Sequence, residues 1–266
     1  MCAQYRIEAN REYLERVYGI KLPKDFEPYD RRILPYSEAP VILQKKGIVL
    51  LEEMVFSLIP PWSDKPKAFF ATHNARLDGL KDVKKKVKGK EVVEEKYQTI
   101  YESGLWKGPF TKQRCVVPIS GFREPLYWGD LAGHWGLFRS KDHELLSAAA
   151  IYSEWTDKKT GEVVPSFAII TDDPYDDVEK NGHHRSPLFL KPDAVEEWIS
   201  EEKIEGPDAF KFLRKNRLKT KFEIEPQEEM AASWKKRVKE KEEEREFEAK
   251  FRKERPKYVA AAKETA

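Results

Sequence analysis

The feature that most constrains the fold is a set of short apolar segments at irregular spacing. Segments that resemble β-strands occur at 41–51, 54–58, 115–119, 134–138, 145–152 and 167–171. Clear helical patterns occur only at 11–19, which ends at Gly19, and at 192–199. Because strands and helices do not alternate regularly, the chain is not expected to form a parallel βαβ sheet. The pattern predicts an α+β fold.

Two charged segments stand outside this pattern. The lysine-rich stretch 81–104 is predicted to be partly helical and to form a solvated insertion on the surface. From about 234 to 254 the composition shifts to Lys, Glu and Arg without a sustained heptad. We therefore predict a single compact domain over 1–230 and a charged helical or disordered tail over 231–266. For the tail, a solvated extension is favoured over a helix that docks on the domain.

Composition limits the class of protein. The apolar content of 40% is enough for a core, and no apolar run approaches the ~20 residues of a membrane span. The first ten residues lack the layout of a signal peptide, so we expect a soluble, intracellular protein. Two cysteines are too few for a disulfide framework or a zinc knuckle, and both should be thiols. A net charge of +2 neither requires nor excludes nucleic acid.

The second residue has chemistry that an internal residue lacks. Removal of Met1 would leave Cys2 at the N-terminus, with a free α-amine and a thiol on the same residue. Such an aminothiol can condense with an aldehyde through its amine and close through sulfur to a thiazolidine ring. Alternatively, a cysteine stands at position 2 by chance.

Three further segments carry polar groups that suit a reactive site, and each also has an ordinary structural explanation. Asn74 and Arg76 could orient a polar group and clamp a phosphate, or belong to a turn with a surface arginine. Glu124 follows an apolar strand among aromatic residues, where its pKa could be raised, or it faces solvent. His183 could move protons and Arg185 could hold an anion, or both lie in a polar loop. Further zinc ligands at suitable spacing are absent.

Together these segments resemble a known family. Cysteine at position 2, Asn74-Ala75-Arg76, Gly121-Phe122-Arg123-Glu124 and His183-His184-Arg185-Ser186-Pro187 occur in the order typical of SRAP-domain proteins, the SOS-response-associated peptidase or abasic-site processing proteins. The segments 36–40 and 58–62 are similar to two further motifs of that family, and the resemblance extends to about residue 225. The chain departs from the family at Ala3, Gln4 and Ser186, which concerns DNA affinity more than chemistry.

The resemblance implies a role for each matching residue. Cys2 matches the cysteine that crosslinks to an abasic site, Asn74 the asparagine that positions the opened sugar, Glu124 the catalytic glutamate and His183 the family histidine. Arg76 and Arg185 match family arginines and are expected to bind DNA. Trp62 and Pro40 are expected to stack on or wedge against bases, although Trp62 could equally pack in the core. The implied fold is a compact α+β domain around a curved, barrel-like antiparallel sheet with a positively charged DNA groove.

The implied function is the sensing of abasic sites in single-stranded DNA and their capture as a thiazolidine crosslink, with crosslink reversal and self-removal of Met1. We expect a monomer that needs no metal and no cofactor, lies away from membranes, and is DNA-associated in the cytoplasm, or in the nucleus of a eukaryote. Two alternatives remain. One is a cysteine-type peptidase that acts on other proteins through Cys2, His183 and Asn74. The other is a non-catalytic DNA-binding module.

Overall fold

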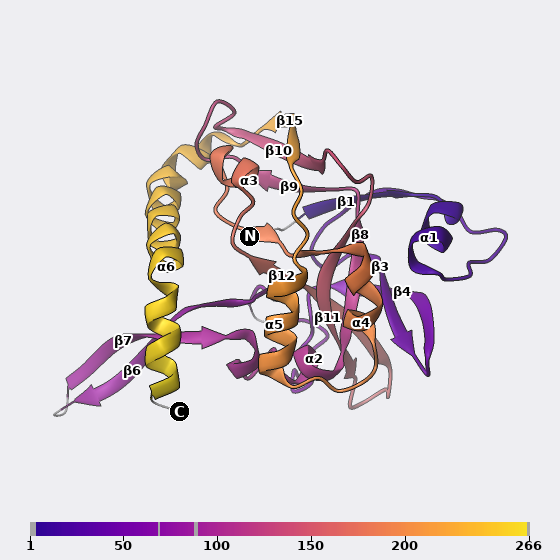
Figure 1. The fold of residues 1–266 in the computed structure, drawn as a ribbon, viewed down its shortest axis with the longest axis horizontal. Helices are drawn as coiled ribbons and strands as arrows, with labels where there is room; N and C mark the ends of the chain where they lie inside the picture. The colour runs from indigo at the N-terminus through magenta and orange to yellow at the C-terminus, as the bar shows by residue number, and fades with distance from the viewer. Residues whose placement is uncertain (1–3, 69, 88–89, 265–266) are drawn as a thin grey trace.

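A closed sheet of five strands forms the centre of the domain in the computed structural model, which describes residues 4–68, 70–87 and 90–264 (Figure 1). The five strands are β3 (Glu38–Lys45), β4 (Ile48–Phe56), β8 (Arg114–Ile119), β11 (Leu146–Thr156) and β12 (Val163–Asp172). They pair in the order β12-β4-β3-β8-β11, and the β11–β12 pairing closes the ring. This confirms the predicted barrel-like sheet and α+β class. Only β12 breaks the antiparallel pattern within the ring, since it runs parallel to β4.

Three short strands extend the barrel at β11 and β12. They are β5 (Asn74–Arg76), β13 (Ser186–Pro187) and β14 (Phe189–Leu190). β5 lies parallel to β12, and β13 pairs with β12 in the antiparallel sense. These pairings bring the Asn-Ala-Arg segment and the segment that follows the two histidines to the same barrel strand.

A second, open sheet lies beside the barrel, in the order β15-β10-β9-β1-β2. It contains β1 (Gln4–Ala9), β2 (Tyr29–Ile33), β9 (Gly121–Pro125), β10 (His134–Ser140) and β15 (Phe222–Glu229). The chain passes from barrel strand β8 to β9 through Ser120 alone, whose backbone N–H donates to the Arg6 carbonyl at 2.9 Å. This connection places Glu124 where the two sheets meet.

One continuous apolar core joins the two sheets. The side chains of β1 alternate between half-buried and buried, as expected for a strand with one face on the core, whereas every residue of β8 is buried. Aromatic rings fill the junction, where Phe122 of β9 stacks on Phe138 of β10 at 5.1 Å between centroids. The strands that hold the candidate site are therefore rigidly supported.

Short helices cover the sheets. They are α1 (Arg11–Tyr18), α2 (Lys107–Lys112), α3 (Asp176–Lys180), α4 (Val195–Ile199) and α5 (Gly206–Asn216), with 3₁₀ turns η1 (Ile100–Glu102), η2 (Pro192–Ala194) and η3 (Ala232–Arg237). The predicted first helix is confirmed: the Asn10 side chain caps its start, and Gly19 ends it at a φ of 66°. The predicted helix at 192–199 is present as η2 followed by α4.

Two expectations for secondary structure are wrong. The stretch 81–104 is mostly a β-hairpin, formed by β6 (Asp78–Val87) and β7 (Lys90–Thr99), that projects from the domain (Figure 1). Its lysines and glutamates favour a helix by composition, but they pair across the two strands instead, as Lys84 does with Glu91 at 2.8 Å. The boundary between the strands predicted at 41–51 and 54–58 is also misplaced. The turn lies at Lys46 and Gly47, both with positive φ, which makes β3 and β4 one hairpin.

The charged tail forms a long helix, α6 (Val238–Glu264), which runs along one side of the domain and past the β6–β7 hairpin (Figure 1). Phe251 of this helix is only 1% exposed, and Glu248 only 6%. The favoured solvated extension is therefore wrong, and the docked helix is the alternative observed. Among the described helices, none combines the length and the apolar character needed to cross a membrane.

Candidate functional site

A buried glutamate and a buried histidine meet at the junction of the two sheets. Glu124 lies near the end of β9, and His183 lies in the loop between α3 and β13. The Nε2 atom of His183 is 3.4 Å from the Oε2 atom of Glu124. Their exposed fractions are 2% and 0%, respectively. The fold thus brings together two of the predicted site residues, although 58 residues separate them in the sequence.

The carboxyl group of Glu124 is in an unusual environment for an acid. Neither of its oxygens has a hydrogen-bond partner among the described residues. Burial raises the pKa of Glu124 from its usual 4.5 to about 7. A carboxyl with such a pKa can give up or accept a proton near neutral pH. A buried carboxyl with a pKa near neutrality, beside a histidine that lines a cavity, is a candidate for a functional group.

The imidazole of His183 is held in the neutral form. Burial lowers its pKa well below the usual 6.5. We assign the ring proton to Nδ1, which lies 3.0 Å from the carbonyl oxygen of Arg185 and donates to it. This tautomer leaves a lone pair on Nε2, which faces Glu124. The two groups can therefore share one proton between them.

The described start of the chain lies next to this pair. β1 pairs with β9 so that Gln4 is opposite Arg123, the residue before Glu124. The Gln4 side-chain oxygen also accepts a hydrogen bond of 2.7 Å from Arg123, whose guanidinium lies 4.5 Å from the centroid of the Trp135 ring. Cys2 and Ala3 lie outside the described residues.

A cavity of about 720 Å³ opens beside the histidine. Its domain side is lined by His73, Tyr127, Trp135, His183 and Arg185. Because His183 both contacts Glu124 and lines the cavity, it connects the buried carboxyl to the opening. Asn74, which follows His73 directly, begins β5 beside Ile169 of β12 and is half-buried. The aromatic rings and Arg185 on this side suit a planar ligand with a negative charge, whereas the wall formed by α6 carries four glutamates.

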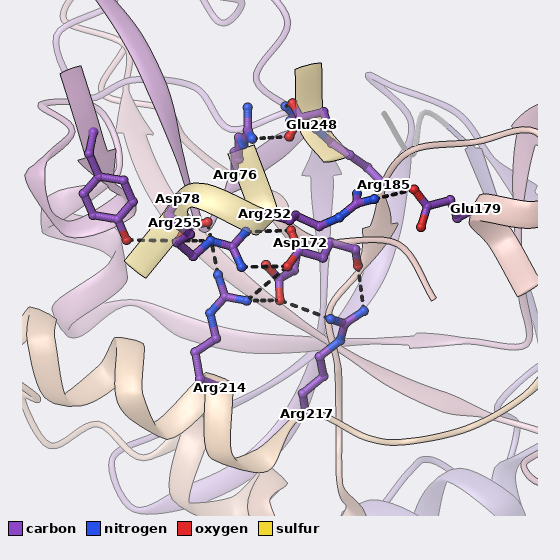
Figure 2. Close-up of polar contacts among 12 residues, drawn as sticks. Arg76, Asp78, Asp172, Glu179, Arg185, Arg214, Arg217, Glu248, Arg252 and Arg255 are labelled. Carbon is purple, nitrogen blue, oxygen red and sulfur yellow. Dashed lines mark hydrogen bonds and ion pairs between the residues drawn. The ribbon is translucent and has the colours of Figure 1, made fainter. Parts of the chain in front are cut away.

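The two predicted DNA-binding arginines lie close together, but both face an acidic partner. Glu248 of α6 accepts from Arg76 with one carboxylate oxygen and from Arg185 with the other, the latter at 2.7 Å (Figure 2). Burial and the neighbouring charge of Arg185 lower the pKa of Arg76 to about 10. The pair is a site for an anion, and in this structure the anion is a carboxylate from the chain itself.

The other two predicted DNA contacts differ from each other in exposure. Trp62 follows β4 and is 61% exposed, so it is not packed in the core. Pro40 is buried within β3, opposite Glu53, and presents no exposed face on which a base could stack.

Sequence reasoning missed the residues that α6 brings to the cavity, above all Glu244 and Glu248. Their spacing held a signal. Glu244, Glu248, Phe251 and Arg255 follow one another at intervals of three or four, which places them on one face of a helix. His73 and His184 were not singled out either; His184 stacks on His183 at 5.0 Å between ring centroids. Within the described ranges, no three Asp, Glu, His or Cys residues could together hold a metal ion.

Comparison with known proteins identifies the family. The family described as SOS response associated peptidase (SRAP) matches residues 81–234, more than half of the chain. The chain belongs to the SRAP family. Relatives include the abasic site processing protein HMCES of Gallus gallus, 28% identical over 210 residues, and the abasic site processing protein YoaM of Bacillus subtilis, 26% identical over 166 residues. These alignments cover 68% and 61% of this chain, but only 56% and 62% of the relatives.

Solved structures share the fold of this chain. A protein from Bordetella bronchiseptica superposes with a TM-score of 0.63 at 16% identity, covering 85% of this chain and 100% of its own. One from Bacteroides thetaiotaomicron gives a TM-score of 0.60 at 21% identity, covering 88% and 94%. The barrel and its attached sheet are therefore shared with other single domains.

Burial of the Glu124 carboxyl should lower the free energy of unfolding at a pH where this group is ionised. The folded state binds the Glu124 proton more tightly than the unfolded state does, so stability falls as pH rises from 4.5 to about 7. A pKa unit corresponds to about 1.4 kcal/mol, which makes the full cost about 3 kcal/mol above pH 7. Glu124→Gln should therefore stabilise the protein at pH 8 and have little effect near pH 4.5, as measured by urea unfolding.

A matched control for this prediction is Glu196→Gln, which removes the same charge at an exposed position of α4. It should change stability little at either pH. An equal effect of Glu124→Gln at both pH values would contradict the assigned direction of the pKa shift.

Proposed function

We propose that this chain recognises abasic sites in DNA and captures them covalently through the α-amine and thiol of Cys2. The observation that carries the proposal is the buried pair of Glu124 and His183, a proton-sharing acid and base beside a cavity whose domain side carries aromatic rings and Arg185. The names of the relatives, abasic site processing proteins, support abasic sites as the substrate.

The position of β1 supports Cys2 as the nucleophile. Gln4 pairs with Arg123, the neighbour of Glu124. Cys2 is two residues before Gln4, and two residues span at most about 7 Å. The amine and thiol of a trimmed N-terminus are thus within reach of Glu124, and removal of Met1 is a condition of the proposal.

The proposed reaction balances without a cofactor. An abasic site in its open form carries an aldehyde. The α-amine, whose reference pKa is about 8, forms a C–N bond to the aldehyde carbon, and one water leaves as the imine forms. The thiol sulfur then adds to the imine carbon, its proton passes to the nitrogen, and a thiazolidine ring closes. The ring closure is intramolecular, which favours the product.

Glu124 and His183 have distinct parts in this reaction. Protonated Glu124 donates to the departing hydroxyl during imine formation, and its raised pKa keeps enough of that form near neutral pH. Neutral His183 accepts a proton at Nε2 and promotes opening of the sugar ring. Asn74 holds the opened sugar by hydrogen bonds. The same acid and base can return the proton in the reverse direction, which would release the DNA.

Single-stranded DNA is the proposed form of the substrate. Arg76 and Arg185 would bind backbone phosphates, and the exposed ring of Trp62 would stack on a base. These contacts do not distinguish base sequence. Binding should accordingly weaken as salt rises.

The test is a crosslinking assay with three labelled strands that differ at one position. One strand carries an abasic site, one a tetrahydrofuran analogue without an aldehyde, and one an intact nucleotide. Mass spectrometry of the intact protein first verifies that Met1 is absent. We expect a product that survives heat and detergent with the abasic strand alone. An equal product with the analogue, or none with any strand, would refute the proposal.

A further inference from the structure

Helix α6 forms one wall of the cavity beside His183. Its residues Glu240, Glu243, Glu244, Phe247 and Glu248 line the cavity opposite Tyr127, Trp135 and the two histidines. The Nε2 atom of His184 lies 3.4 Å from the Oε2 atom of Glu244. A strand of DNA that enters the cavity from this side would meet these four carboxylates, two of which are paired with Lys241 of the same helix. Since phosphates and carboxylates repel, this wall disfavours a bound strand while the helix is docked.

Glu248 occupies the position that a phosphate would take. Its two oxygens bind the guanidinium groups of Arg76 and Arg185, one each, which is how two arginines also hold the non-bridging oxygens of a phosphate (Figure 2). The Glu248 side chain is buried, and the neighbouring Arg185 charge contributes to the lowered pKa of Arg76. The two arginines therefore repel one another and need an anion between them. The helix supplies that anion.

Most of the remaining contacts of α6 are between charged groups. One apolar side chain anchors the helix: the Phe251 ring lies 6.3 Å from the Tyr97 ring of β7 and beneath the Arg76 guanidinium. The other anchors are ion pairs and a cation–π contact, in which the Arg245 guanidinium lies 4.8 Å from the centroid of the Trp128 ring. Arg255 binds Asp173 at 2.7 Å. Arg255 also lies 3.1 Å from Asp78, and Arg252 pairs with Glu179 (Figure 2). Twelve of the 23 positions from 238 to 260 are exposed, so docking depends on the inner face of the helix, with its ion pairs, one ring and one cation–π contact.

We propose that α6 is an intramolecular competitor of the DNA, which must leave the domain before Arg76 and Arg185 can bind a strand. This inference rests on the proposed function, because the competing ligand is the strand that carries the lesion. When α6 is docked, the protein is closed, and its apparent affinity equals the intrinsic affinity scaled by the fraction of molecules in which α6 has left. Any change that favours the released helix should therefore tighten binding.

The test uses the full chain and three substitutions. Glu248→Gln removes the competing charge, and Phe251→Ala removes the apolar anchor while leaving Glu248 in place. Glu246→Gln is the matched control, since it removes the same charge from an exposed position of the same helix. Affinity is measured by fluorescence anisotropy with an undamaged single-stranded oligonucleotide, so that the readout does not depend on crosslinking. Hydrogen exchange of the wild-type chain, with and without that oligonucleotide, reports on residues 244–258 of α6.

We expect Glu248→Gln and Phe251→Ala each to tighten binding about fivefold or more, and Glu246→Gln to change it less than about twofold. Exchange over 244–258 should become faster when the oligonucleotide binds. Unchanged affinity in both variants, or unchanged or slower exchange, would overturn the inference. A gain in Glu248→Gln alone without faster exchange would also overturn it, because an added positive charge explains that result.

These outcomes separate the inference from the proposed function. If abasic DNA is crosslinked but neither variant binds more tightly, α6 is a fixed part of the domain and the crosslinking proposal stands. If the variants bind more tightly but no abasic strand is crosslinked, the competitor role stands and the crosslinking proposal does not. If neither the wild type nor the variants bind the oligonucleotide, both are refuted.

Discussion

Cys2→Ala should form no heat-stable product with an abasic strand, whereas the wild type does. The alanine variant, once trimmed, still carries a free α-amine and can form the imine. It lacks the sulfur that closes the ring, so the imine hydrolyses. Borohydride, which reduces an imine to a stable amine, should therefore restore a covalent product in Cys2→Ala. The measurement is the fraction of labelled strand that migrates with protein, with and without the reductant.

Cys115→Ala is the matched control for the loss of a thiol. Cys115 is fully buried in β8, and burial raises the pKa of its thiol, so it is not a nucleophile near neutral pH. This variant should crosslink as the wild type does. Normal crosslinking by Cys2→Ala without reductant would refute the thiazolidine chemistry. A product that borohydride fails to restore would place the first bond at sulfur instead of nitrogen.

Glu124→Gln should slow crosslinking by about 10²–10⁴-fold, the usual contribution of general acid–base catalysis. Glutamine retains the shape of the side chain but cannot donate a proton to the departing hydroxyl. Binding of the undamaged strand should change little, because Glu124 lies behind His183. The measurement is the rate of product formation at saturating protein, together with affinity for the undamaged strand.

The pH dependence of this variant gives a sharper result than the rate alone. In the wild type, rate should rise with pH as the α-amine, of reference pKa about 8, loses its proton. It should fall as Glu124, of pKa about 7, loses the proton that it must donate. The profile is a bell, and Glu124→Gln should retain only the rising limb. Glu196→Gln, the exposed control, should keep both limbs. A falling limb that persists in Glu124→Gln would assign the acid to another group.

Several barrel strands were predictable from apolar runs bounded by turn residues, whereas the barrel itself was expected only from the family resemblance. β8 is buried at every position, and such a run has few alternatives to a central strand. The β6–β7 hairpin was not predictable from the same signals, since lysine and glutamate side chains satisfy a solvated helix or a solvated ribbon equally well. The pairing that decides between them lies between residues on different strands.

The site was partly predictable for a similar reason. Motifs identified Glu124 and His183, but their contact and the burial that shifts both pKa values depend on how β9 meets the loop after α3. The role of Glu248 could not be recognised from the sequence, because nothing in the sequence distinguishes this buried glutamate from the exposed glutamates around it. Burial of a charge depends on its partners, and both arginines are distant in sequence.

Displacement of Glu248 by a phosphate would change how DNA binding responds to salt. A strand that displaces Glu248 replaces one anion on Arg76 and Arg185 with another, and the freed carboxylates of the helix then gather cations of their own. Fewer small ions are released overall than the number of phosphates touched would suggest. The slope of log affinity against log salt should therefore be shallower in the wild type than in Glu248→Gln, and counting phosphates from the wild-type slope would undercount them.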